Sequence, residues 1–184
     1  MALCFTGLVR LREGMAVPKI VNAEVPTISG TTYPDEYAAE CLPRRRQPLG
    51  DAAGLDQFGV NLLHLPAGAW SSQRHWHFTE DEFVWVVSGE VVLVEGQPNP
   101  DGSGETLVET VLRAGECAGF KAGVPNGHKI ENRSDSLAVL LEVGTRNPTG
   151  DGCDYPDIDM VLPLGADRYH HRDGTPYPKY DRRT

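Results

Sequence analysis

Short apolar runs, separated by turn residues, occupy the middle of this chain of 184 residues. Residues 82–87 are rich in β-branched and aromatic side chains, which is typical of a β-strand. No segment sustains the 3.6-residue period of an amphipathic helix over three or four turns. We therefore predict strands at residues 59–65, 82–87, 91–94, 106–112, 117–121, 128–132 and 137–143.

Turn residues between these runs predict how the strands connect. Residues 66–68 and the Gly-, Pro-, Asn- and Asp-rich residues 97–104 are typical of surface turns and loops. Residues 88–90 (Ser-Gly-Glu) indicate a tight turn, which would join residues 82–87 and 91–94 as a hairpin. Many short strands with turn signals between them indicate an all-β barrel or sandwich.

The chain divides into three regions. Residues 1–56 form an N-terminal arm that prolines interrupt, and residues 57–146 carry the predicted barrel. Residues 147–184 are rich in Pro, Asp and Tyr, and we expect an ordered C-terminal tail that crosses the barrel surface. Met15 begins a segment that reads like an ordinary protein start, which leaves open whether residues 1–14 belong to the native protein.

Charge and hydropathy exclude several classes of function. The formal net charge of -9 offers no basic surface for a nucleic acid. The apolar residues 1–9 precede Arg10 and Arg12, which is the wrong order for a secretory signal. No run reaches the roughly 18 apolar residues that a membrane span requires. We expect a cytoplasmic protein with neither a nucleic-acid nor a membrane partner.

The cysteines give no framework of their own. They are widely separated and form no C-x-x-C pair, so no disulfide scaffold or zinc knuckle is indicated. Cys117 is expected to be a small, buried strand residue. The four cysteines are Cys4, Cys41, Cys117 and Cys153.

The densest chemistry surrounds residue 76. His75 and His77 are two residues apart, so in an extended segment both imidazoles project from the same face. This spacing suits the chelation of a metal ion. Glu82 follows at the start of an apolar run, and strand alternation places its carboxylate on the same face as Val84, with Trp85 on the opposite face.

These residues resemble the first motif of the cupin superfamily, in which a glycine, an H-x-H pair, a glutamate and a second glycine follow at set spacings. His75, His77, the four-residue gap to Glu82 and the six-residue gap to Gly89 all agree with the motif. The opening glycine, Gly68, lies one residue farther upstream than the motif requires.

A second cupin motif is matched more loosely. Gly115, Gly123, His128 and Asn132 occur in the expected order. Lys121 stands where the family has proline, and four residues separate Gly123 from His128. These departures lie in a loop, so they affect its conformation more than the histidine.

The resemblance spans about residues 58–145 and implies a small single-domain cupin with a jelly-roll barrel, also called a double-stranded β-helix. It further implies one divalent transition metal held by His75, His77, Glu82 and His128. Three nitrogens and one oxygen suit Fe, Mn, Ni, Cu or Zn, among which the sequence does not choose. Open positions at such a metal would receive a small-molecule substrate.

Two classes of function fit this site. The first is a metalloenzyme that acts on a small polar metabolite, with oxidoreductase (dioxygenase), isomerase and lyase chemistry all open and no catalytic residue assigned. The second is a sensor or binding module that uses the metal to recognise a small ligand without turnover. A metal-free sugar epimerase is disfavoured because the full ligand set is present.

Neighbouring polar residues have ordinary explanations. Glu80 and Asp81 are expected to be solvated, although Glu80 keeps an alternative role as an acid near the metal. Gln73, Lys121 and Asn126 lie near the expected barrel mouth, where substrate contact competes with a plain surface role. Three further histidines are expected to be packing or surface residues: His64, His170 and His171.

A homodimer is expected on two grounds. The long arms lack a second core on which to pack, and small barrels leave strand edges that need covering.

Overall fold

The computed structural model describes residues 19–184, which are almost entirely β-structure and irregular segments. The predictions about Met15 and Cys4 lie outside the described residues. Helical segments are short, namely the 3-10 turns η1 (Asn22–Glu24), η2 (Asp35–Tyr37) and η3 (Ala39–Cys41) and the α-helix α1 (Leu49–Ala52). The predicted all-β fold is confirmed.

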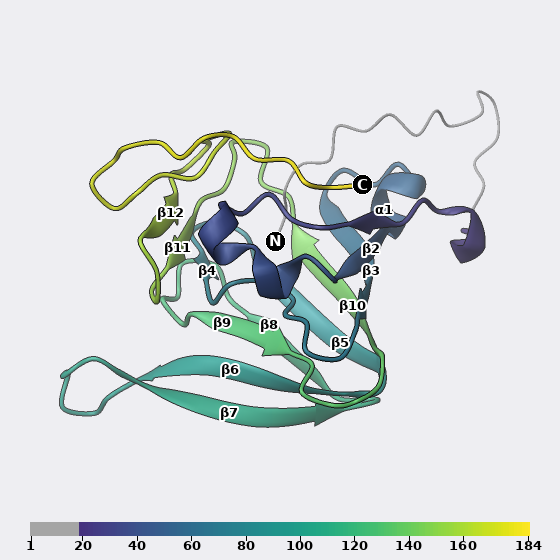
Figure 1. Cartoon of the computed structure of the whole chain (residues 1–184), viewed down its shortest axis with the longest axis horizontal. Coiled ribbons are helices and arrows are strands. Elements are labelled where there is room, and N and C mark those ends of the chain that lie inside the picture. The colour runs from purple at the N-terminus through teal and green to yellow at the C-terminus, as the bar shows by residue number, and fades with distance from the viewer. Residues whose placement is uncertain (1–18) are drawn as a thin grey trace.

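Three antiparallel sheets organise the described residues (Figure 1). The largest has the strand order β1-β2-β3-β10-β5-β8, and the others have the orders β7-β6-β9 and β12-β11-β4. The first sheet contains β1 (Ile28–Ser29), β2 (Arg45–Pro48), β3 (Phe58–Leu65), β5 (Glu82–Ser88), β8 (Cys117–Phe120) and β10 (Ala138–Thr145). The second contains β6 (Glu90–Pro98), β7 (Glu105–Arg113) and β9 (His128–Glu131), and the third contains β4 (Trp76–His77), β11 (Cys153–Tyr155) and β12 (Met160–Leu162).

The predicted hairpin at residues 88–90 is wrong. β5 pairs with β10 and β8, whereas β6 pairs with β7 and β9. Gly89 connects the two strands with a φ of 84°, a conformation that favours glycine. Each strand has one apolar row, and placing the strands in opposite layers lets these rows cover each other.

The barrel core lies between the two larger sheets. Along β5, Val84 and Val86 are 5% and 0% exposed, whereas Phe83 and Trp85 are 39% and 43% exposed, which confirms the predicted alternation. Glu82 begins the inward row of the same strand. The buried core residues are Leu63, Leu65, Ala69, Val84, Val86, Val91, Leu93, Leu112, Ile130, Ala138 and Leu140.

A second, aromatic core joins the N-terminal arm to the C-terminal tail. Tyr33 of the arm packs edge-on against Tyr155 of the tail, with ring centroids 5.8 Å apart. At the end of the tail, Thr184 exchanges two backbone hydrogen bonds with Ser29 in β1, at 2.9 and 3.2 Å. The tail therefore runs from the barrel end back to the arm (Figure 1).

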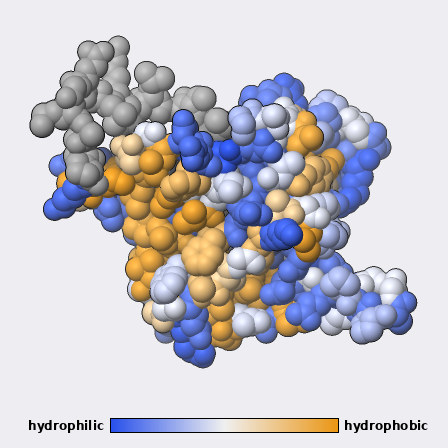
Figure 2. Space-filling view, turned by 180° about the vertical axis from the view of Figure 1, so that it is seen from behind, coloured by the Kyte–Doolittle hydropathy of each residue, from blue (hydrophilic) through white to orange (hydrophobic). Residues whose placement is uncertain are grey.

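The outer face of the largest sheet is apolar. Phe58, Phe83, Trp85 and Val87 are exposed on it or at its edge, and Figure 2 shows a broad hydrophobic surface on this side of the molecule. Cys117, in β8, pairs with Trp85 of β5 and is also exposed. The expected burial of Cys117 is therefore wrong, because no described segment covers the outward-facing side chains of this sheet. None of the helices in residues 19–184 has the length and apolar character of a membrane span.

Candidate metal centre

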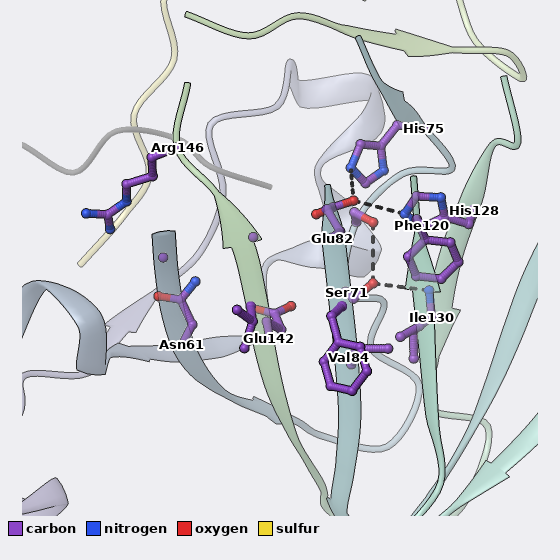
Figure 3. A pocket seen from close by; sticks show the side chains of 15 residues that line it. Asn61, Ser71, His75, Glu82, Val84, Phe120, His128, Ile130, Glu142 and Arg146 are labelled. Carbon is purple, nitrogen blue, oxygen red and sulfur yellow. Dashed lines mark hydrogen bonds and ion pairs between the residues drawn. The ribbon is translucent and has the colours of Figure 1, made fainter. Parts of the chain in front are cut away.

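Three chain segments bring the four predicted ligands together at one end of the barrel, and Figure 3 shows three of them, His75, Glu82 and His128. His77 lies in β4, and the preceding His75 exchanges two backbone hydrogen bonds with His128, at 3.0 and 2.9 Å. Glu82 begins β5 and His128 begins β9. Because β5 and β9 belong to opposite sheets, these four side chains, called the His–Glu cluster below, lie between the two layers.

The ligand atoms of the cluster face one another. His75 Nε2 lies 3.1 Å from His77 Nε2. Glu82 Oε2 lies 3.0 Å from His128 Nε2, 3.4 Å from His77 Nε2 and 3.8 Å from His75 Nε2. Two atoms that bind one metal ion at right angles, each at about 2.1 Å, are about 3 Å apart. The ligand atoms of His75, His77 and Glu82 all lie within 4.8 Å of one another, which fits a single transition-metal ion, and His128 Nε2 joins this group through its contact with Glu82 Oε2.

Backbone carbonyls orient two of the imidazoles. His75 Nδ1 lies 2.9 Å from the carbonyl oxygen of Gln73, and His128 Nδ1 lies 3.0 Å from that of Asn126. A carbonyl oxygen only accepts hydrogen bonds, so each Nδ1 carries a proton and each Nε2 faces the cluster as the candidate metal-ligand atom.

The third imidazole is oriented by the C-terminal tail. His77 Nδ1 donates to Asp151 Oδ2, while Asp151 Oδ1 accepts hydrogen bonds from Thr79 N–H and Thr79 Oγ1–H, both at 2.9 Å. Cys153 Sγ lies 3.2 Å from His77 Nδ1, because β11 pairs with β4 with Cys153 opposite His77. His77, Asp151 and Cys153 thus form a second group of metal-ligand types within 4.8 Å of one another.

The tail also covers a face of the cluster. The ring of Tyr155 stacks on that of His75, with centroids 5.5 Å apart and an interplanar angle of 15°. Sequence reasoning missed Asp151, Cys153 and Tyr155, since they lie outside both cupin motifs. Only the pairing of β11 with β4 brings them to the site, and no spacing rule in the sequence connects the two segments.

Burial and opposite charges govern protonation in the cluster. Burial lowers the pKa of His75 well below its usual value, which keeps this imidazole neutral. Burial also lowers the pKa of His77, but Glu82 and Asp151 outweigh it and raise the pKa to about 11. The pKa of Glu82 is held well below its usual range, despite its burial, by the facing His77 and His128. A metal ion at His77 Nε2 would therefore compete with a proton.

A first pocket opens from the His–Glu cluster toward the barrel interior (Figure 3). Asn61 and Glu142, which are paired across β3 and β10, form part of its polar wall with Ser71 and Arg146. Arg46 holds the Glu142 carboxylate through two hydrogen bonds of 2.8 and 3.0 Å. The first pocket therefore has a polar wall beside its apolar lining, and Arg46 balances the charge of Glu142.

A second pocket also adjoins the cluster, and its walls include His77 and Glu82. Glu80 also lines it and is only 5% exposed, so the expected solvation of Glu80 is wrong. Burial raises the pKa of this carboxyl group. Its Oε1 accepts a hydrogen bond from Asn147 N–H at 2.8 Å, because the tail folds over the turn that precedes β5.

The remaining candidates separate clearly. Lys121 and Asn126 both line the second pocket. Gln73 is buried, and its side-chain amide donates to the carbonyl of Tyr37 at 2.9 Å, so it is a packing residue. Three histidines have partners away from the cluster, namely His64 with Gln47, His170 with the carbonyl of Gly174, and His171 with Asp159.

Comparisons with known proteins agree with this geometry. A family model for the cupin domain matches residues 61–144. A crystal structure from Silicibacter pomeroyi, described as a sugar phosphate isomerase from a cupin superfamily, is 39% identical, with a TM-score of 0.76 over 89% of this chain and 100% of that chain. The chain belongs to the cupin superfamily.

A second structure similar to this cupin is described as a putative sugar phosphate isomerase from Acidithiobacillus ferrooxidans. It is 28% identical, with a TM-score of 0.59, over 70% of this chain and 74% of that chain. No functionally curated protein matches the sequence.

Proposed function

We propose that this cupin is a metal-dependent isomerase of a small hydroxylated carbonyl compound, with sugar phosphates as the substrate class. The observation that carries the proposal is the convergence of three imidazole Nε2 atoms and Glu82 Oε2 at a site that opens into two pockets. A structural metal site is closed by its ligands, whereas a catalytic site keeps positions open. The names of the two similar structures favour an isomerase over dioxygenase or lyase chemistry.

The proposed ligands of one divalent metal, drawn from Fe, Mn, Ni, Cu and Zn, are His75, His77, Glu82 and His128. When bound, such an ion acts as a Lewis acid that stabilises negative charge developing on a carbonyl or enediolate oxygen. The chain holds the ligands in place: the two backbone carbonyls and Asp151 keep the Nδ1 atoms protonated, so that every Nε2 is directed inward.

The first pocket supplies groups that suit a polyhydroxylated substrate. The side chain of Asn61 makes no hydrogen bond within residues 19–184, so its amide is available to substrate hydroxyl groups. Glu142 is fixed by Arg46 and presents its remaining lone pairs to the same space. These groups bind and orient a sugar without competing for the metal.

The test is the conversion of sugar phosphates by the metal-loaded protein in D₂O. Aldose-to-ketose isomerisation moves a proton between neighbouring carbons, so we expect NMR to show product together with deuterium at the carbon next to the carbonyl. Treatment with a chelator should abolish conversion, and readdition of metal should restore it. A fully metal-loaded protein that binds sugar phosphates but converts none would contradict the isomerase and favour the binding module.

A ligand variant tests the proposed metal set independently of turnover. We expect His77→Ala to lose its metal during purification, as measured by elemental analysis. The matched control is His64→Ala, because His64 hydrogen-bonds to Gln47 away from the cluster and its loss should leave the metal content unchanged. Full metal content in His77→Ala would contradict the ligand assignment.

The homodimer expected from the sequence is also proposed, with the outer face of the largest sheet as its interface. This face is broad and apolar, which is uncommon on monomers, and a second copy related by a two-fold axis would cover it with an identical surface (Figure 2). We expect Trp85→Glu to shift the protein from dimer to monomer in light scattering. A compact wild-type monomer would contradict the interface.

A further inference from the structure

We infer that the second pocket is a subsite for a hydroxylated anion, in which Lys121 binds the anionic group and Asn126 and Glu80 accept hydrogen bonds from hydroxyl groups. This inference rests on the proposed function, because the subsite would hold the part of the substrate farthest from the reacting carbons.

The position of the pocket makes it an extension of the metal site. Its walls include His77, Glu82 and His128 of the His–Glu cluster, and it shares Glu82, Phe120 and His128 with the first pocket. A ligand held at the cluster can therefore reach both pockets. Trp76 and Val124 add apolar surface to the second pocket, which suits the carbon face of a sugar.

Asn126 presents an acceptor that has no donor in the described chain. Its Nδ2 donates to Glu95 Oε1 at 3.2 Å. Because a carboxylate only accepts hydrogen bonds, this contact fixes the amide with its NH₂ group toward Glu95 and its carbonyl away from it. The carbonyl atom, Oδ1, is buried and has no hydrogen-bond partner among residues 19–184.

Glu80 presents a second acceptor of the same kind. Its Oε1 is occupied by Asn147 N–H at 2.8 Å, whereas its Oε2 is buried without a partner in the described residues. These are the two buried side-chain atoms in residues 19–184 that lack a partner, and both residues line the second pocket. Buried polar atoms are nearly always satisfied, so their coincidence in one pocket indicates a ligand with hydroxyl donors.

Lys121 supplies the positive charge. It follows β8, lines the pocket and is exposed, and it forms no ion pair within residues 19–184. By contrast, two arginines near the first pocket already form ion pairs, Arg46 with Glu142 and Arg146 with Asp51. A lysine that shares a pocket with two unsatisfied acceptors is complementary to a molecule with several hydroxyls and one anionic end.

The experiment measures binding to the metal-loaded protein by calorimetry, with glucose 6-phosphate, gluconate, glucose and inorganic phosphate as probes. We expect Lys121→Ala to weaken the better of the two hydroxylated anions at least about tenfold, since a charge-assisted hydrogen bond is lost. Binding of neutral glucose should not change. Tighter binding of glucose 6-phosphate than of gluconate would identify the anionic group as a phosphate. Tighter binding of gluconate would identify it as a carboxylate.

Asn126→Ala separates the two kinds of contact. It should weaken the hydroxylated probes by several fold and leave inorganic phosphate unchanged, because the hydroxyl acceptor is removed while Lys121 remains. The matched control is Lys179→Ala, since Lys179 is an exposed lysine that pairs with Asp167 in the tail. This control should bind every probe as the wild type does.

Equal binding of the hydroxylated anions by Lys121→Ala and wild type would overturn the subsite, as would the absence of wild-type binding to both. Lys121 is exposed, so a folding defect is not expected to hide the result. Lys121-dependent binding without turnover would leave the subsite standing while overturning the proposed isomerase.

Discussion

The three histidines of the cluster are oriented in two different ways. His75 and His128 each donate Nδ1–H to a backbone carbonyl two residues earlier, at Gln73 and Asn126. His77 instead donates to the side chain of Asp151, which comes from the tail. The first arrangement is local and insensitive to side-chain identity, whereas the second depends on one carboxylate far away in the sequence.

This difference shows which histidine has a hydrogen-bond acceptor that a substitution can change. A backbone carbonyl cannot be removed by substitution, and its acceptor strength is fixed. A carboxylate adds a negative charge that raises the basicity of the imidazole, and it can be changed without touching the barrel. The C-terminal tail is therefore expected to set metal affinity, while the barrel sets the position of the ligands.

The largest effect is expected from Asp151→Asn. Asp151 accepts at both oxygens, from His77 on one side and Thr79 on the other, whereas asparagine has a single acceptor oxygen. We expect metal affinity to fall between about tenfold and a hundredfold, measured by competition with a chelating dye. Asp167→Asn, in an exposed part of the tail, is the control. Unchanged affinity in Asp151→Asn would show that all three histidines are held by the barrel alone.

A second substitution tests the locally held pair. The side chain of Arg74 is 3% exposed, and it binds Asp157 through Nη2 at 2.6 Å and contacts Glu105. Its Nη1 also donates to the carbonyl of Gly127, beside His128, at 3.4 Å. We expect Arg74→Met to lower the free energy of unfolding by about 2 kcal/mol in urea titration.

The effect of Arg74→Met on metal affinity should be smaller than that of Asp151→Asn, because the backbone carbonyls remain. Arg113→Met is the control, since the side chain of Arg113 is 64% exposed and its pair with Glu90 should contribute less than about 1 kcal/mol. A larger loss of metal affinity in Arg74→Met than in Asp151→Asn would reverse the comparison between local and tail-based support.

The smallest effect concerns acid stability. The hydrogen bond from Arg74 lowers the pKa of Asp157 below its usual value. A depressed pKa contributes stability that is present above the unfolded value of about 4 and is lost as the pH falls through the folded value. Because the Asp157 side chain is 44% exposed, we expect a modest loss in wild type below about pH 4. In Arg74→Met, the free energy of unfolding should not show this loss below about pH 4. An equal loss in both proteins would contradict the contribution of the Arg74–Asp157 pair.

Much of the fold followed from local pattern. Strand alternation placed Val84 inside and Trp85 outside, because side-chain direction has a period of two. Pairing did not follow in the same way. The turn at Gly89 looked like a hairpin, yet the chain changes sheets there, since pairing depends on which layer offers a partner.

The burial of Glu80 could not be predicted from the residues next to it in the sequence either. Its position beside Asp81 indicated solvent, but residue Asn147 of the tail folds over it and hydrogen-bonds to its carboxylate. Burial of a side chain in a turn depends on segments that pack from elsewhere, and these have no fixed distance along the chain.

Motif spacing and strand alternation were enough to predict the all-β fold, the family and the four candidate residues of the His–Glu cluster, because both are properties of neighbouring residues. The three-dimensional packing was needed to show which sheet each strand joins, how Asp151 and Tyr155 reach the histidines, and that Glu80 and Asn126 share a pocket with Lys121. These arrangements arise from packing between segments that are distant in sequence, and such packing leaves no periodic trace in the chain.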